Sequence, residues 1–190
     1  MENKSTKSKI LSSLVWKLLE RSGTQGIQFL VQIVLARILL PADYGLISLI
    51  AIFITIANVF VQSGFNTALI QKKDANEQGF SSVFYLSLFI ATLLYIVIFF
   101  TAPYIAKFYN ILELTSVLRI LSITLFFGAF NSIQNAVIAR RMQFKKLFFS
   151  SLGAIILSGI TGIILAYEGF GVWALVIQQL VNQLSVIIIL

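Results

Sequence analysis

Cysteine and histidine are both absent from the 190 residues of this sequence. Without cysteine there is no disulfide bond and no thiolate site, and without histidine there is no imidazole to hold a metal ion. Thiol chemistry and imidazole–metal chemistry are therefore excluded. We expect neither a metal site nor a cofactor.

Charged residues are also scarce, at 11% of the sequence, whereas soluble domains carry about 25%. Hydrophobic residues make up 58%, and the mean hydropathy is +0.95. This composition predicts an integral membrane protein. The seven acidic residues are Glu2, Glu20, Asp43, Asp74, Glu77, Glu113 and Glu168. Glu20 alone falls within an apolar run, three residues after Lys17, where a local ion pair is the simplest explanation. No catalytic constellation is visible, so we do not expect an enzyme.

Basic residues exceed acidic ones, and the net charge is +7. They occupy short segments between apolar runs, which is typical of cytosolic loops and not of a nucleic-acid-binding face. Nine of them fall on one side of the predicted membrane: Lys4, Lys7, Lys9, Lys72, Lys73, Arg140, Arg141, Lys145 and Lys146. Lys107 falls on the other side. We therefore expect a cytosolic N-terminus and no nucleic-acid partner.

Six apolar runs are each long enough to span a bilayer, which takes about 20 helical residues. They cover about residues 12–40, 44–70, 80–101, 115–139, 147–167 and 172–190. Residues 1–11 form a basic cytosolic tail without a small-residue cleavage site, so the first run is expected to remain as a span. The sixth run ends at Leu190 without a basic flank, so we expect the chain to be truncated. The predicted fold is an all-α, polytopic membrane protein.

Turn-forming residues and short polar segments separate these runs. Pro41 and Gly45 mark the end of the first run and the start of the second. Residues 71–79 are polar and are expected to form a loop. Pro103 is expected to end the third run, and residues 104–114 are expected to lie at the membrane surface as a short amphipathic segment.

The first run carries a polar stripe made of Lys17, Arg21, Gln25, Gln28 and Gln32. At about 100° per residue these side chains fall within an arc roughly 80° wide. Ionisable groups in a membrane cost about 2.5–3.5 kcal/mol each, so the stripe is expected to face water or partner helices. Lys17 and Arg21 could instead reach the cytosolic surface from the first turns. The glutamines lie too deep for that explanation.

Three other runs carry shorter polar seams. The second has Thr55, Asn58, Gln62 and Asn66; the fourth has Thr124, Gly128, Asn131 and Asn135; the sixth has Gln178, Asn182 and Ser185. Runs one, two, four and six are therefore expected to face a polar interior, and runs three and five to be peripheral. Amide bonds between helices would explain any single seam. Four seams in six runs favour a lined cavity.

Four motifs, in order along the chain, resemble those of the polysaccharide flippase family. They are LARILLPADYGLISLI (35–50), GFNTALIQKKD (64–74), ARRMQFKKL (139–147) and GFGVWALV (169–176). The resemblance covers essentially all of residues 10–190. These proteins are the lipid-linked oligosaccharide and O-antigen exporters of the multidrug/oligosaccharidyl-lipid/polysaccharide superfamily.

The resemblance implies a transporter of two pseudo-symmetric six-helix lobes around a central cavity, of which this chain would be the N-terminal lobe. The second lobe would come from the same full-length chain or from a second copy. The implied activity moves an undecaprenyl-pyrophosphate-linked oligosaccharide across the bacterial cytoplasmic membrane by alternating access. The implied partners are this lipid-linked substrate and membrane lipids. Related lipid flippases hold pyrophosphate with cationic residues of the first helix, a position that Arg21 and Lys17 occupy here.

The predicted substrate-binding residues are Arg21, Lys17, Gln25, Gln28, Gln32, Asn58, Gln62, Asn131 and Asn135. The cations would attract the pyrophosphate, and the amides would bind sugar hydroxyls. Two alternatives remain open at this point. One is a drug or ion antiporter of the same superfamily, which would require an aspartate or glutamate on the face of a helix that lines its cavity. The other is a membrane assembly subunit, in which the seams only join helices.

Overall fold

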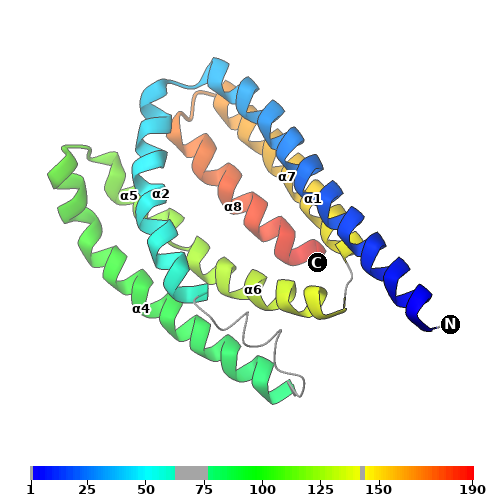
Figure 1. The fold of residues 1–190 in the computed structure, drawn as a ribbon. Helices are drawn as coiled ribbons and strands as arrows, with labels where there is room; N and C mark the ends of the chain where they lie inside the picture. The colour runs from blue at the N-terminus through cyan, green and yellow to red at the C-terminus, as the bar shows by residue number, and fades with distance from the viewer. Residues whose placement is uncertain (1, 63–76, 142–143) are drawn as a thin grey trace.

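The structure is a computed structural model that describes residues 2–62, 77–141 and 144–190, with side chains for residues 15–61, 82–138 and 144–190 (Figure 1). Over this part of the chain every regular element is an α-helix. The helices are α1 (Glu2–Ile38), α2 (Pro41–Gln62), α4 (Glu77–Tyr109), α5 (Glu113–Leu121), α6 (Thr124–Arg141), α7 (Phe144–Tyr167) and α8 (Val172–Ile189). The all-α fold expected from the sequence is confirmed.

Five helical segments are long and apolar enough to cross a membrane. They are Pro41–Val61, Ser82–Tyr109, Glu113–Ile138, Phe144–Tyr167 and Val172–Ile189. These segments make the chain a polytopic membrane protein. α1 is not among them, because the polar residues of its stripe lower its hydropathy. A sixth span in α1 therefore stays a prediction. Residues 2–11, expected to be a cytosolic tail, are helical and form the first turns of α1, and their cytosolic location stays a prediction.

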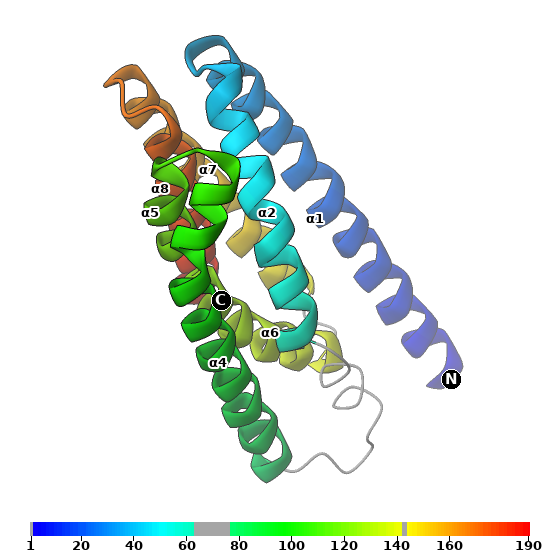
Figure 2. The ribbon, with the colours of Figure 1, turned by 90° about the vertical axis from the view of Figure 1, so that its left-hand side faces the viewer.

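The helices form two groups that meet at α8. α1, α7 and α8 pack side by side, while α2, α4, α5 and α6 form the other group (Figure 1). Figure 2 shows α4 on the far side of α2 from α1. Each group has its own apolar core: Ile50, Leu118 and Leu125 are fully buried in the larger one, and Leu35 and Ala174 in the smaller one. The polar residues discussed below lie between these two cores.

The third predicted run does not end at Pro103. α4 continues through this proline to Tyr109, and the chain turns only at Asn110, which has a φ of 57°. Residues 104–109 therefore belong to α4, so residues 104–114 do not form a helix of their own. Their location at the membrane surface stays a prediction. Proline has no backbone N–H, so the carbonyl of Phe99, four residues earlier, loses its helical partner. Arg119 Nε of α5 donates to this carbonyl at 3.2 Å. A side chain from the next helix thus replaces the bond that Pro103 removes.

The fourth predicted run is interrupted at Ser122 and Ile123, between α5 and α6, where the chain changes direction (Figure 1). Two hydroxyl groups bond to backbone carbonyls beside this break. Ser122 Oγ donates to the Leu118 carbonyl at 2.6 Å, and Thr124 Oγ1 donates to the Leu121 carbonyl at 2.5 Å. Such bonds compete with the regular helical ladder and bend helices. The polar face that the sequence predicts for this run therefore belongs to α6.

At one end of the bundle the turn between α1 and α2 meets the turn between α7 and α8. Asp43 Oδ2 accepts a hydrogen bond from the Leu40 N–H at 3.0 Å, and Pro41 is the first residue of α2. Both features are typical of helix starts. Gly171 has a φ of 55°, and a Cβ added to it would lie 3.5 Å from Asp43 Oδ1. Two of the four family-like motifs are thus in contact.

Towards the opposite end, Trp16 and Lys17 of α1 lie beside the start of α7. The amine of Lys145 is 5.5 Å from the centre of the Trp16 ring, and the amine of Lys17 is 5.5 Å from the centre of the Phe144 ring. The Trp16 and Phe148 rings are 5.6 Å apart. This proximity fits the predicted shared side for the N-terminus and the basic segment before α7. Which side is cytosolic stays a prediction.

α7 was expected to be peripheral, but it packs against both α1 and α8. Its buried face consists of small residues: Ser150, Ala154, Ser158, Gly159, Gly162 and Ala166. A Cβ at Gly159 would lie 2.8 Å from Val31 of α1, and one at Gly162 would lie 3.0 Å from Gln178 of α8. Small residues let helix backbones approach closely in membranes. α7 is therefore the central helix of the smaller group.

Candidate functional site: a polar track along the first helix

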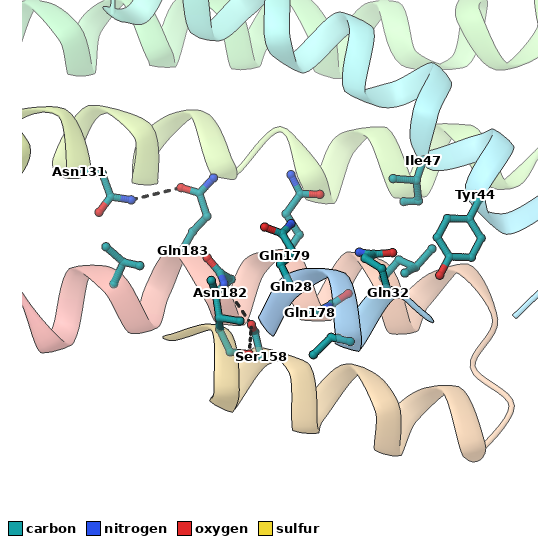
Figure 3. A pocket seen from close by; sticks show the side chains of 14 residues that line it. Gln28, Gln32, Tyr44, Ile47, Asn131, Ser158, Gln178, Gln179, Asn182 and Gln183 are labelled. Carbon is teal, nitrogen blue, oxygen red and sulfur yellow. Dashed lines mark hydrogen bonds between the residues drawn. The ribbon is translucent and has the colours of Figure 1, made fainter. Parts of the chain in front are cut away.

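A pocket of about 520 Å³ lies between the two cores (Figure 3). We call it the amide pocket, because seven of its lining residues are glutamines or asparagines. The lining residues are Gln28, Val31, Gln32, Tyr44, Ile47, Asn131, Ile155, Ser158, Leu175, Gln178, Gln179, Asn182, Gln183 and Val186. The pocket joins the predicted seams of α1, α6 and α8. α2 contributes Tyr44 and Ile47 in place of its predicted seam, and α7 adds Ile155 and Ser158.

Some amides in this pocket are fixed by neighbours. Asn131 Nδ2 of α6 donates to Gln183 Oε1 of α8 at 3.2 Å, and Asn182 Nδ2 of α8 donates to Ser158 Oγ of α7 at 3.1 Å (Figure 3). The oxygen Asn131 Oδ1 is buried without a hydrogen-bond partner among the described residues. These bonds hold α6 and α7 against α8. They confirm that part of the polar seams joins helices.

Other amides in the pocket are unpaired. Gln28, Gln32, Gln178 and Gln179 have no hydrogen bond to any described residue, and the buried hydroxyl of Tyr44 also lacks a partner. Figure 3 shows their side chains in the space between α1, α8 and the start of α2. A primary amide carries two donors and one acceptor oxygen, so these groups offer both kinds of hydrogen bond to a ligand. Helix packing does not account for them.

A second pocket, of about 470 Å³, lies nearer the start of α1. We call it the lysine pocket. It is lined by Lys17, Glu20, Asn131, Ser132, Asn135, Ala136, Phe144, Leu147, Ser151 and Val186. Lys17 is exposed within it and forms no ion pair with Glu20 in the part of the chain described. The expected local ion pair is therefore wrong, because the Lys17 amine turns towards the Phe144 ring instead.

The two pockets adjoin, because both are lined by Asn131 and Val186. From Lys17 to Gln32 the distance along α1 is about 22 Å at 1.5 Å per residue. We call the combined surface the polar track. It presents a cation at one end and unpaired amides at the other, along the stripe of α1 that the sequence singles out.

Not every predicted site residue lies on the track. Arg21 and Gln25 are exposed and line neither pocket, because along α1 they lie between the residues that line the lysine pocket and those that line the amide pocket. Asn58 is half-buried in α2 and lines neither pocket, and its Oδ1 has no partner among the described residues. The side chain of Gln62 is outside the described residues. Lys17, Gln28, Gln32, Asn131 and Asn135 do line the track.

The predicted set of site residues omits several that line the amide pocket. Gln178 and Asn182 stand in the polar seam of the sixth run but are absent from that set, and Gln179, Gln183 and Tyr44 were not singled out at all. The signal was present in the sequence: Gln178, Gln179, Asn182 and Gln183 repeat at helical spacing in an otherwise apolar run. Tyr44 gives no such signal, because its place depends on how α2 leaves α1.

Comparisons with known proteins agree with the membrane architecture. Over 174 residues the chain is 29% identical to the succinoglycan biosynthesis transport protein ExoT of Rhizobium meliloti, covering 89% of this chain and 34% of ExoT. Over 91 residues it is 30% identical to the teichuronic acid biosynthesis protein TuaB of Bacillus subtilis, covering 48% of this chain and 19% of TuaB. Over 164 residues it is 23% identical to an uncharacterised membrane protein in the cps region of Klebsiella pneumoniae, covering 84% of this chain and 34% of the relative.

The chain thus spans about a third of the length of the curated relatives that it matches over most of its residues. No solved structure is significantly similar to it. A family model described as polysaccharide biosynthesis protein matches residues 34–190, which include α2 to α8 and the last turn of α1. On this match, the chain belongs to the polysaccharide biosynthesis protein family.

Proposed function

We propose that this chain is one lobe of a flippase that moves an undecaprenyl-pyrophosphate-linked oligosaccharide across the bacterial cytoplasmic membrane. Export of polysaccharide or its precursors is the role that the family and the name of ExoT support. The observation that carries the finer proposal is the polar track, with Lys17 at one end and unpaired glutamines at the other. Such a surface suits an amphiphilic ligand with an anionic linker and a hydroxyl-rich head.

The diphosphate is proposed to bind at the lysine pocket. Lys17 lines this pocket, and Arg21 lies one turn further along α1 with its side chain exposed. A unit charge pair 4 Å apart is worth about 4 kcal/mol at an effective dielectric constant of 20, before desolvation. Arg21 adds a planar fork that matches phosphate oxygens. In this proposal Arg21 captures the headgroup at the mouth of the pocket, and Lys17 neutralises it within.

The glycan is proposed to lie along the amide pocket. Sugar hydroxyls both donate and accept hydrogen bonds, as do the unpaired amides of Gln28, Gln32 and Gln178. Alternating access would open the track to one leaflet and then to the other, together with a second lobe. That lobe is proposed to come from the same full-length chain or from a second copy, with the N-terminus in the cytosol.

The test is glycan export by the full-length protein in a strain that lacks it. Arg21→Ala and Lys17→Met should abolish or strongly reduce export, and Arg21→Lys should reduce it partially, because charge is kept and the fork is lost. Lys107→Met is the matched control, since Lys107 is exposed on α4 and lines neither pocket. Membrane abundance of each variant is measured by immunoblot. Normal export by Arg21→Ala and Lys17→Met at normal abundance would contradict the proposed headgroup site.

One observation favours a second candidate, an ion-coupled antiporter. Glu20 lines the lysine pocket, which places an acid on a cavity face. Intramembrane acids commonly mark proton or ion pathways. If drug or ion exchange is the function, Glu20→Gln should abolish that exchange while glycan export stays unaffected. Loss of glycan export in Glu20→Gln, with drug or ion exchange unchanged, would instead favour the flippase and would assign Glu20 a role in its transport cycle.

A further inference from the structure

The lining of the amide pocket contains no aspartate, glutamate, lysine or arginine among the described residues. From this lining we propose that the amide pocket is a subsite for an uncharged sugar residue and selects against sugars that carry a carboxylate. The inference rests on the proposed flippase function and adds the chemical class of the glycan that passes. The polar groups that face the ligand are neutral amides and the Tyr44 hydroxyl.

The unpaired amides suit hydroxyl groups because they both donate and accept. Gln28 and Gln32 lie one turn apart on α1, and Gln178 and Gln179 face them from α8 (Figure 3). A sugar ring between the two helices can accept from the amide nitrogens and donate to the amide oxygens with neighbouring hydroxyls. The buried hydroxyl oxygen of Tyr44 adds one further group without a described partner. A neutral polyol can thus bond to amides that form no hydrogen bond to a described residue.

A carboxylate has no counter-charge in this pocket. It can accept hydrogen bonds from the amide nitrogens, but it cannot donate to the amide oxygens, and burying it away from a cation is costly. Among the described lining residues of the two pockets, the basic one is Lys17, at the far end of the track. If Lys17 is occupied by the diphosphate, a second anion on the glycan finds no partner. The charge pattern therefore favours the diphosphate of the substrate at the lysine pocket and an uncharged sugar at the amide pocket.

The side chain of Gln178 occupies space that a glycine on the facing helix, Gly162 of α7, leaves open beside the amide pocket. A Cβ at Gly162 would lie 3.0 Å from both Cβ and Cγ of Gln178 and 3.2 Å from its Cδ. Gly162→Ala must therefore displace the Gln178 side chain. Gly162 is in this sense a positioning residue. Gly153 offers a matched control on the same helix, because its added Cβ would lie 3.3 Å from Cδ1 of Ile189, which lines neither pocket.

The test uses the full-length protein in proteoliposomes and two synthetic probes on one polyprenyl-diphosphate carrier. One probe bears a glucosyl–glucose disaccharide, and the other has glucuronic acid in place of the outer glucose. The wild-type protein should move the neutral probe at least tenfold faster. Gln178→Arg should reduce this ratio several-fold, since it supplies the missing cation. Gly162→Ala should also lower the ratio, whereas Gly153→Ala should leave it unchanged.

The outcomes separate this inference from the function on which it rests. Movement of neither probe would contradict the flippase function. Movement of both probes at equal rates would leave that function standing and overturn the selectivity. A Gly162→Ala variant that moves both probes more slowly but keeps their ratio would mean that Gly162 only packs helices, and would overturn its positioning role.

Discussion

Arg119 is predicted to stabilise the bundle by completing a helix that Pro103 interrupts. Its Nε donates to the Phe99 carbonyl at 3.2 Å, and its guanidinium carbon lies 4.0 Å from the centre of the Phe99 ring. Arg119→Met removes both contacts but keeps much of the side-chain length. The carbonyl of Phe99 then has neither a backbone donor nor a side-chain donor. In the apolar part of a membrane such a group finds no water to replace them.

The size of the effect follows from these two contacts. A hydrogen bond from a charged donor contributes about 1.5–3 kcal/mol, and a cation–π contact about 0.5–2 kcal/mol. Arg119→Met should therefore lower the free energy of unfolding by about 2–5 kcal/mol. Pro103→Ala restores a backbone N–H that can bond to the Phe99 carbonyl. In that background the same Arg119→Met change should cost about 1.5–3 kcal/mol less, since only the ring contact is lost.

The assay is reversible unfolding of the purified full-length protein in mixed micelles, followed by helical circular dichroism. Four proteins complete the double-mutant cycle: the wild type, each single variant and the double variant. Arg37→Met serves as the control, because Arg37 is exposed and has no hydrogen bond to a described residue. Equal costs of Arg119→Met in the two backgrounds would refute the reasoning, since the arginine would then not substitute for the bond that proline removes.

Further predictions concern sidedness and the turn between α7 and α8. A cysteine at position 145 should be shielded from an impermeant thiol reagent in intact cells and one at position 107 should react, because Lys145 belongs to the basic side and Lys107 to the other; the reverse pattern would contradict the topology. Gly171→Ala should lower the free energy of unfolding by about 1–3 kcal/mol, because a φ of 55° with a ψ of −128° strains any residue with a Cβ, here beside Asp43. Gly45→Ala should not destabilise, since its helical Cβ meets nothing within 4 Å; equal losses in both variants would count against the strain argument.

The polar stripe of the first helix was predictable because its signal is local. Lys17, Gln28 and Gln32 recur at helical spacing within an apolar run, and a periodic pattern specifies which side chains share a face. The structure places these three along the polar track. Arg21 and Gln25 belong to the same stripe, yet they line neither pocket. The pattern specifies the direction of a side chain around the helix but not which levels along the helix axis adjoin a pocket, and Arg21 and Gln25 lie between the levels of the two pockets.

Other features depend on contacts between distant segments, which no local pattern reveals. A proline usually ends a helix, but α4 continues through Pro103, and the carbonyl that loses its partner there accepts from Arg119, a residue sixteen positions later. The place of α7 between α1 and α8 depends on the small residues of one face, which are equally consistent with a peripheral helix. Tyr44 enters the amide pocket only because the turn at Pro41 directs α2 across the end of α1. These details are set by tertiary packing.

The most direct test of the polar track is substrate protection of a single cysteine introduced at position 28. The 190 residues contain no cysteine, so Gln28→Cys and Phe29→Cys can be compared in a full-length protein cleared of any other cysteine. Gln28 lines the amide pocket, whereas Phe29 is 67% exposed and lines neither pocket. In membrane vesicles loaded with the lipid-linked glycan, a thiol reagent should label the Gln28→Cys variant several-fold more slowly than in empty vesicles, with no change for Phe29→Cys. Equal labelling rates of the Gln28→Cys variant with and without the glycan would contradict the proposal that the glycan moves along this track.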